Sequence, residues 1–409
     1  MRSSLIQLSW ALLGRGLASI LDILFFIVSL TFAPPEIFGK FAVIQITILI
    51  LTPLIVLAGP QIIISEGKNT ANVNLWKSVS NTTISWLIIV GLIVLIQFAF
   101  KFWKGEYYAL KEAIYFSLIT YISVFANHIR AYYNAIQRQK ELARLTIIVS
   151  VIAFLIPFCL LKLGFIYDGL LVRLFVPHLV FLLLTIKVVK FGKLLPYYNI
   201  RIKRVVPSSI VDNLTNNLFQ LFTVNTLDVA SLGIMNRAEF IRNSIFNQFN
   251  QVINSVFVPK YANDNRIERQ RKVDRNTLAL LIIGSLPYIA YVFLSRKTFE
   301  ILLKGSYLSM FEYLDNLIGI AWASMTTSFL VQLDLVDFKG SRMMQYTMIS
   351  SVTYVLGYLF SSNIQNYTFL LLIVNTFYSI FLLLYSIRAF KSAFYFFLII
   401  LLIQWQKFL

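Results

Sequence analysis

Twelve long apolar runs constrain what this chain can fold into more than any other feature of its sequence. A helix that crosses a bilayer needs roughly 20 mostly apolar residues, at about 1.5 Å of rise per residue. The runs predict membrane-spanning helices near residues 5–31, 38–65, 79–102, 110–133, 143–161, 168–186, 208–234, 240–259, 277–295, 310–331, 343–361 and 367–387. In lipid every backbone polar group needs an internal partner, so runs of this length are helices rather than barrel strands. The sequence therefore predicts an all-α, polytopic membrane protein.

The composition excludes a soluble alternative. The 409 residues are 58% hydrophobic and 13% charged, whereas soluble domains carry about 25% charged residues, and no soluble fold of this length could bury so much apolar surface. The first run is not a signal peptide by its pattern, because Arg15 interrupts it and no small-residue cleavage site follows. We expect it to be retained as the first helix. A further, shorter run at 392–405 is either a tilted helix or an interfacial one.

The distribution of positive charge predicts the topology. With the N-terminus placed in the cytoplasm, 23 of the 36 Lys and Arg residues fall in inside segments, Arg130 among them. Nine fall in outside segments, including Arg237 and Arg242. This excess on the inside predicts a multi-pass membrane protein of twelve spans with both termini cytoplasmic. It also accounts for most of the net charge of +18 without nucleic acid as a partner.

The basic stretch at 187–207 divides the predicted helices into six and six. We expect an N-terminal six-helix bundle at 1–195, a C-terminal six-helix bundle at 196–391 and an additional apolar segment at 392–409. Two such bundles around a central cavity are typical of many secondary transporters.

Signatures of catalysis are missing from the sequence. It contains no Walker A, HExxH, GxSxG or GxGxxG motif, and its single cysteine, Cys159, excludes a disulfide framework. His128 and His178 lie on different predicted helices without an acidic neighbour, which favours packed or interfacial histidines. We therefore expect a protein that is not an enzyme and that needs neither a cofactor nor a metal.

Two charges fall near the middle of the first predicted helix. Arg15 and Asp22 are seven residues apart, so they project from one face but lie about 10 Å apart along the axis, too far for direct pairing. Charges at this depth are costly and usually face a bundle interior or a wet cavity. Two interpretations remain open: each charge is paired with another helix, or both line a cavity.

Polar side chains also form stripes on the predicted helices at 208–234 and 240–259. At helical spacing the members share a face, and the cavity candidates among them are Asp212, Asn216, Gln220, Asp228, Arg242, Asn243, Asn247, Gln251 and Asn254. Amides can simply join neighbouring helices, at about 0.6 kcal/mol each, but their number favours a hydrated cavity for hydroxyl-rich groups. Together with Arg15, the arginines Arg173, Arg237 and Arg242 would make this interior cationic, which favours an anionic cargo such as a pyrophosphate headgroup.

At this point the sequence resembles a known family. The stretch LLGRGLASILDILFFIVSLTFAPPEIFGKFAVIQITILILTPLIVLAGPQIIISE is similar to the first two helices of Wzx-type polysaccharide flippases, notably at Phe38-Gly39 and Gly59. Residues 227–262 resemble that family's hairpin of helices seven and eight, in which an aspartate precedes a hydrophobic-Gly turn and Phe-x-Pro ends helix eight, here Phe257 to Pro259. The segment KGSY at 304–307 is a weaker match. The turn after Asp228 departs from the pattern, because it is short and carries Arg237, Glu239 and Arg242.

This resemblance implies the MATE-like fold of the multidrug/oligosaccharidyl-lipid/polysaccharide (MOP) exporter superfamily. It further implies a flippase that moves undecaprenyl-pyrophosphate-linked oligosaccharide repeat units across the bacterial inner membrane for O-antigen, lipopolysaccharide or capsule synthesis. The expected partners are the lipid-linked oligosaccharide and membrane lipids, with a polysaccharide polymerase and a chain-length regulator as further candidates.

Two other kinds of function stay open. A cation-coupled multidrug exporter of the same fold would use embedded acidic residues, for which Asp22, Asp212, Asp228 and Asp315 are candidates. A lipid II flippase is closer still, but such chains usually run longer. A membrane-embedded polymerase or acyltransferase would need a large external loop or a catalytic histidine in context, and the sequence indicates neither.

Overall fold

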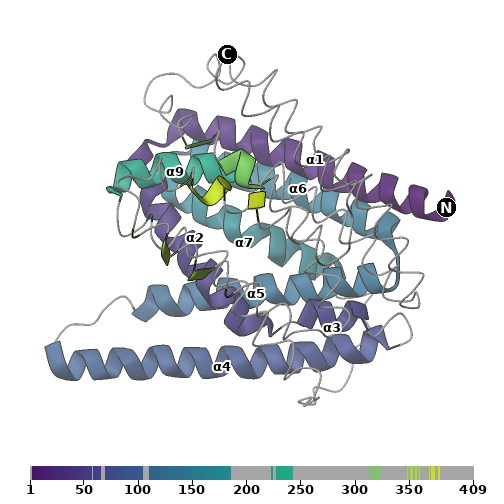
Figure 1. The fold of residues 1–409 in the computed structure, drawn as a ribbon, viewed down its shortest axis with the longest axis horizontal. Helices are drawn as coiled ribbons and strands as arrows, with labels where there is room; N and C mark the ends of the chain where they lie inside the picture. The colour runs from purple at the N-terminus through teal and green to yellow at the C-terminus, as the bar shows by residue number, and fades with distance from the viewer. Residues whose placement is uncertain are drawn as a thin grey trace.

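The structure, a computed structural model, describes residues 2–57, 59–65, 70–104, 110–185 and 227–242, with isolated positions between 223 and 377. All secondary structure in this part of the chain is helical (Figure 1). The helices are α1 (Arg2–Phe32), α2 (Pro35–Val56), α3 (Gly59–Ser65), α4 (Ala71–Lys104), α5 (Leu110–Ala135), α6 (Gln139–Lys162), α7 (Ile166–Thr185) and α9 (Val229–Arg242). Five of these helices, α1, α2, α4, α6 and α7, are long and apolar enough to cross a membrane. The predicted all-helical membrane fold is confirmed.

The predicted helix at 38–65 is two helices in the structure. The chain leaves α2 at Leu57, which has a left-handed backbone with φ of 45°. Helix α3 restarts at Gly59 and Pro60, because a proline lacks the N–H that would continue the α2 hydrogen bonds but is tolerated in a first helical turn. The other five of the first six predicted helices, α1 and α4 to α7, agree within two to four residues at most ends, although α4 begins eight residues earlier than expected.

The prediction for residues 234–240 is wrong, because this segment is not a turn. Helix α9 runs through it without interruption, so Arg237, Glu239 and Arg242 are helical. Helix α9 begins at Val229, directly after Asp228. The Asp228 carboxylate accepts the backbone N–H groups of Ala230 and Ser231 at 2.9 Å and the Ser231 hydroxyl at 2.7 Å. Capping of this kind starts a helix. The hydrogen bonds from the Ser231 backbone and hydroxyl also lower the pKa of Asp228.

The helices pack in pairs around a shared interior. Helix α1 lies along α6, α6 packs on α7, and α4 on α5 (Figure 1). A buried apolar cluster is formed by residues of α3, α4, α5, α6 and α7, among them Leu75, Ala126, Tyr133 and Phe181. Elsewhere large apolar side chains face outward, such as Leu95 at 66% exposure, which is expected of helices that face lipid.

Helix α9 is held against α2 by an unusually close backbone contact. A Cβ added to Gly39 would overlap the backbone of Val229, and one added to Gly233 would overlap the backbone of Pro35. Glycine at both positions lets the two helices approach closely, as small residues do between membrane helices. The contact brings part of the C-terminal half of the chain to the interior of the N-terminal helices.

Candidate functional site

A cavity of about 680 Å³ lies between α1, α2, α3, α5, α6, α7 and α9. This volume is within the usual range for ligand sites of about 300–1,000 Å³. Its wall is mixed in character, with aromatic rings such as Phe25, Phe41 and Phe240 beside polar groups. The polar side chains in the wall are Arg15, Asp22, Gln45, Asn127, Arg130, Asn134, Thr146, Ser150, Arg173, His178, Asn236 and Arg237.

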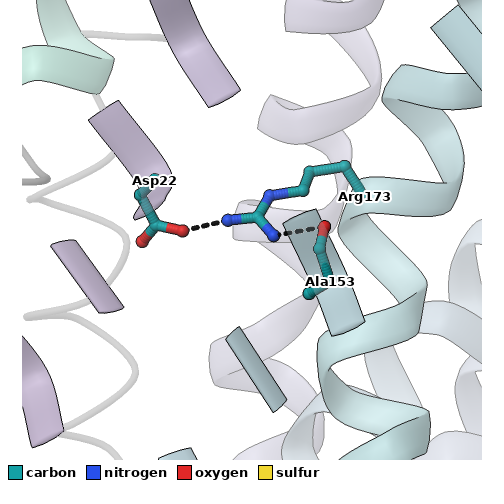
Figure 2. A network of polar contacts seen from close by, with 3 residues as sticks. All are labelled: Asp22, Ala153 and Arg173. Carbon is teal, nitrogen blue, oxygen red and sulfur yellow. Dashed lines mark hydrogen bonds and ion pairs between the residues drawn. The ribbon is translucent and has the colours of Figure 1, made fainter. Parts of the chain in front are cut away.

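Arg173 of α7 joins three helices at one side of the cavity (Figure 2). Its Nη2 group forms an ion pair with Asp22 of α1, and its Nη1 group donates a hydrogen bond of 2.6 Å to the carbonyl of Ala153 in α6. Asp22 thus pairs with a helix other than its own, as one of the two sequence interpretations expects. Arg15 and Asp22 also both line the cavity, as the other interpretation expects.

The carbonyl of Ala153 is available to Arg173 for a reason found in the sequence. In a regular helix it would accept the N–H of the residue four positions later, which here is Pro157, inside α6. Proline has no N–H, so the carbonyl needs another donor, and in a membrane an unsatisfied carbonyl is costly. Arg173 supplies that donor. One nitrogen of the guanidinium is therefore held in place by the α6 backbone, independently of Asp22.

Arg15 and Arg130 add positive charge deeper in the cavity wall. Arg130 of α5 donates a hydrogen bond of 2.8 Å to Asn127, and its guanidinium lies 4.6 Å from the centre of the Phe181 ring. Arg15 and Arg130 line the same cavity. The sequence analysis counted Arg130 among the inside segments; the structure places it within α5, where it lines the cavity.

The two histidines have different environments. His128 is fully buried and packed, with Nδ1 2.8 Å from the Val124 carbonyl and Nε2 3.1 Å from the Thr82 hydroxyl. Its ring packs where Gly59 lacks a Cβ, so a larger residue at position 59 would meet the ring. His178 instead lines the cavity, and its buried Nδ1 has no hydrogen-bond partner among the residues that the structure describes.

Arg237 brings a fourth guanidinium to the cavity, from α9. It is buried, its Nη1 lies 3.3 Å from the Ser29 hydroxyl, and it stacks on the rings of Phe26 and Phe38. The preceding residue, Asn236, donates a hydrogen bond of 2.8 Å to Gln45 of α2. The sequence analysis placed Arg237 in an external segment, which the helical, buried position contradicts.

The cavity wall is cationic. Four arginines line it against one carboxylate, Asp22, among the residues that the structure describes. Charges in such an interior are screened far less than at a surface, so this imbalance favours an anion and disfavours a cation.

The structure places the other predicted site residues as follows. Arg15, Asp22 and Arg173 are in the cavity wall. Asp228 is exposed as the cap of α9, Arg242 lies 3.6 Å from Glu239, and neither is among the described residues of the wall. Seven predicted residues lie outside the described part of the chain: Asp212, Asn216, Gln220, Asn243, Asn247, Gln251 and Asn254.

Sequence analysis missed the polar stripe of α5. Asn127, Arg130 and Asn134 follow i, i+3 and i+7, which is the spacing of one helix face, and all three line the cavity. The helical spacing that selects residues 243–254 selects these three residues as well, but the count of loop charges assigns Arg130 to an inside segment.

Comparison with known proteins agrees with this fold. The sequence matches the family described as "Polysaccharide biosynthesis protein" over residues 32–312, while no curated protein sequence matches it. In structure the chain is similar to a MOP superfamily transporter from Pyrococcus furiosus, described as having a binding pocket of reverse polarity, at 15% identity and a TM-score of 0.67, over 95% of this chain and 96% of that one. It is also similar to a Vibrio cholerae MATE transporter in its bent form, at 13% identity and a TM-score of 0.64, over 97% and 100% of the two chains.

A third similar structure is a multidrug resistance MATE transporter in its outward-facing conformation, at 13% identity and a TM-score of 0.63, over 98% and 96% of the two chains. These likenesses extend over nearly the whole chain and show the MOP-superfamily fold. The family match covers well over half of the 409 residues. The chain therefore belongs to the polysaccharide biosynthesis protein family and has the MATE-like fold of the MOP superfamily.

Proposed function

We propose that this protein is a flippase for a diphosphate-bearing, lipid-linked oligosaccharide, namely an undecaprenyl-pyrophosphate-linked repeat unit for O-antigen or capsule synthesis. The observation that carries the proposal is the cavity wall, in which Arg15, Arg130, Arg173 and Arg237 face a single described carboxylate. Guanidinium binds phosphate oxygens through paired donors, so such a wall is suited to a pyrophosphate.

The remaining polar groups of the wall are suited to the sugar. Asn127, Asn134, Gln45 and Asn236 supply carboxamides that both donate and accept, and Thr146 and Ser150 supply hydroxyls. Hydroxyl-rich cargo can exchange hydrogen bonds with water for hydrogen bonds with these groups. Membership of a polysaccharide biosynthesis family supports the same cargo class.

The proposed setting follows from this cargo. The flippase acts in the bacterial inner membrane with both termini in the cytoplasm, receives its cargo at the inner leaflet and releases it at the outer leaflet. A polysaccharide polymerase and a chain-length regulator would act on the cargo after its release.

Reconstitution tests the proposal. The purified full-length protein is placed in proteoliposomes with an undecaprenyl-pyrophosphate oligosaccharide that carries a dithionite-sensitive fluorophore on its sugar. With an active flippase, dithionite added outside bleaches the whole label, whereas protein-free vesicles keep the inner-leaflet share. Unchanged bleaching with well-reconstituted protein would contradict the proposal.

One observation favours a second function, a cation-coupled exporter. Asp22 is an acidic residue inside the cavity of a fold shared with multidrug transporters. Its carboxylate is already neutralised by Arg173, however, which leaves the wall without a free negative charge among the described residues. Gradient-driven efflux of ethidium from the same vesicles would support the exporter instead.

A further inference from the structure

The Asp22–Arg173 pair combines features that a purely structural ion pair does not need (Figure 2). Both side chains face the cavity, with 23% of Asp22 and 14% of Arg173 exposed. The pair is therefore accessible to whatever enters the cavity, and it is not sealed between helices.

Arg173 does not depend on Asp22 for its position. Its Nη1 group is held by the Ala153 carbonyl that Pro157 leaves without a helical donor, and its guanidinium lies 5.1 Å from the centre of the Phe25 ring. The half of the guanidinium that faces Asp22 is thus presented to the cavity by the helix backbone and an aromatic ring. If the carboxylate moved away, that half would stay where it is.

The charge balance gives the carboxylate a role in the empty cavity. Arg15, Arg130 and Arg237 add further positive charge to the wall. An uncompensated guanidinium in a site of low dielectric constant is unfavourable. Asp22 offsets part of this cost when no anion is bound.

We infer that Asp22 is a built-in stand-in for a cargo phosphate: its carboxylate occupies one anion position on Arg173, and an incoming phosphate group displaces it. The inference rests on the proposed function, because it assigns a role to a residue of the same cavity. A carboxylate and a phosphate present the same kind of paired oxygens to a guanidinium, so both compete for one set of donors. By competing with the cargo, Asp22 weakens binding and assists release.

The first test measures binding of inorganic pyrophosphate to the full-length protein in nanodiscs by calorimetry. Removing the competitor in Asp22→Asn should lower the Kd about tenfold, which corresponds to about 1.4 kcal/mol. Asp22→Glu keeps the competing charge and should bind like the wild type. The matched control is Asp168→Asn, at the first turn of α7 and outside the described cavity wall, which should change nothing. Damage to the fold would weaken binding and could not strengthen it.

Transport gives a second readout of the same idea. In the vesicle assay, Asp22→Asn should lower both KM and kcat for the lipid-linked oligosaccharide, because cargo is held more tightly and released more slowly. If wild type binds pyrophosphate and Asp22→Asn binds it no more tightly, the stand-in role is wrong while the flippase proposal stands. If wild type neither binds pyrophosphate nor moves the lipid, the flippase proposal fails first.

A variant pair decides the matter even if Asp22→Asn does not accumulate. Arg173→Gln leaves the Asp22 carboxylate unpaired in the cavity, where it repels phosphate, so pyrophosphate binding should be nearly lost. Adding Asp22→Asn to Arg173→Gln removes that repulsion and should restore part of the binding through the other arginines. An equal Kd in the single and double variants would overturn the inference.

Discussion

At the residue scale, the function of the cavity depends on how each arginine is held. Arg173 is fixed by the carbonyl of Ala153, and Arg130 by Asn127 and the Phe181 ring. Arg237 is fixed by Ser29 and two rings. The partners named here are neutral, and Asp22 on Arg173 is the one carboxylate among the described residues of the wall. This arrangement distinguishes a binding wall from a network of structural salt bridges.

Substitutions of Arg15 distinguish a role of its charge in binding cargo from a role in stabilising the fold. If its guanidinium binds the cargo diphosphate, Arg15→Lys should keep partial transport and Arg15→Gln should nearly abolish it, with normal protein abundance for both. If it serves structure alone, Arg15→Gln should lower abundance, because breaking a buried pair costs about 3–5 kcal/mol. The measurements are initial rates in the dithionite assay and the yield of folded protein.

The control for Arg15 is Arg138→Gln. Arg138 is an exposed arginine that pairs with Glu141 at the turn before α6, so its loss should leave transport unchanged. Equal transport by wild type and Arg15→Gln at matched abundance would remove Arg15 from the cargo site.

Pro157 gives a second prediction at this scale. Pro157→Ala restores the helix N–H that competes with Arg173 for the Ala153 carbonyl, so the guanidinium should lose its anchor. We expect a weaker affinity for pyrophosphate, by about tenfold for a lost charge-assisted hydrogen bond, with thermal stability unchanged or raised. Calorimetry and a melting curve of the same sample measure both. Ala substitution of Leu155, which is half exposed on the same helix, is the control.

At the scale of elements, the contact between α2 and α9 joins the two halves of the chain. Gly39 and Gly233 bring the helix backbones together, and Asn236 and Arg237 then reach Gln45 and Ser29. A side chain at either glycine would separate these helices and withdraw Arg237 from the cavity wall.

Two glycine substitutions separate this packing effect from helix propensity. Gly39→Ala places a Cβ against the Val229 backbone, and overpacking of this kind costs about 1–3 kcal/mol, so the melting temperature should fall. Gly91→Ala lies in the middle of α4 with nothing near its Cβ, and it should gain about 0.5–1 kcal/mol of helix stability. We therefore expect the melting temperature to fall for Gly39→Ala and to rise for Gly91→Ala. A Gly39→Ala protein as stable as wild type would show that the close approach is not required.

At the scale of the whole molecule, the described helices form a bilayer-spanning shell around a polar interior. Large apolar residues face outward on α4, while arginines and amides line the cavity. The likeness to MOP-superfamily structures extends over at least 95% of this chain. The division into bundles at 1–195 and 196–391, with a separate segment at 392–409, stays a prediction.

Topology is the prediction that belongs to this scale. Both termini and the basic loops at 187–207 and 260–276 should lie in the cytoplasm, since basic residues are retained on that side. Fusions of alkaline phosphatase and a fluorescent protein at these loops measure the sidedness, and the phosphatase should be inactive at both. Active phosphatase at either loop would show that the predicted topology is wrong and that the cavity has the opposite orientation in the membrane.

Sequence alone predicted the helical membrane architecture and the family, and it identified Arg15, Asp22 and Arg173 as candidates for the interior. These follow from local causes: apolar run length, the cost of charge in lipid, and hydrophobic motifs along the chain. It did not determine the α2–α3 break or the extent of α9, because these depend on the left-handed backbone of Leu57 and on the cap formed by Asp228.

Tertiary structure alone decided the partners. The pairing of Asp22 with Arg173 links residues 151 positions apart, and that of Arg237 with Ser29 links residues 208 positions apart. No periodicity within one helix can indicate which neighbour it will face. The anchoring of Arg173 at Ala153 required both kinds of information, because Pro157 frees the carbonyl by a local rule and only the packing of α7 on α6 brings the guanidinium to it.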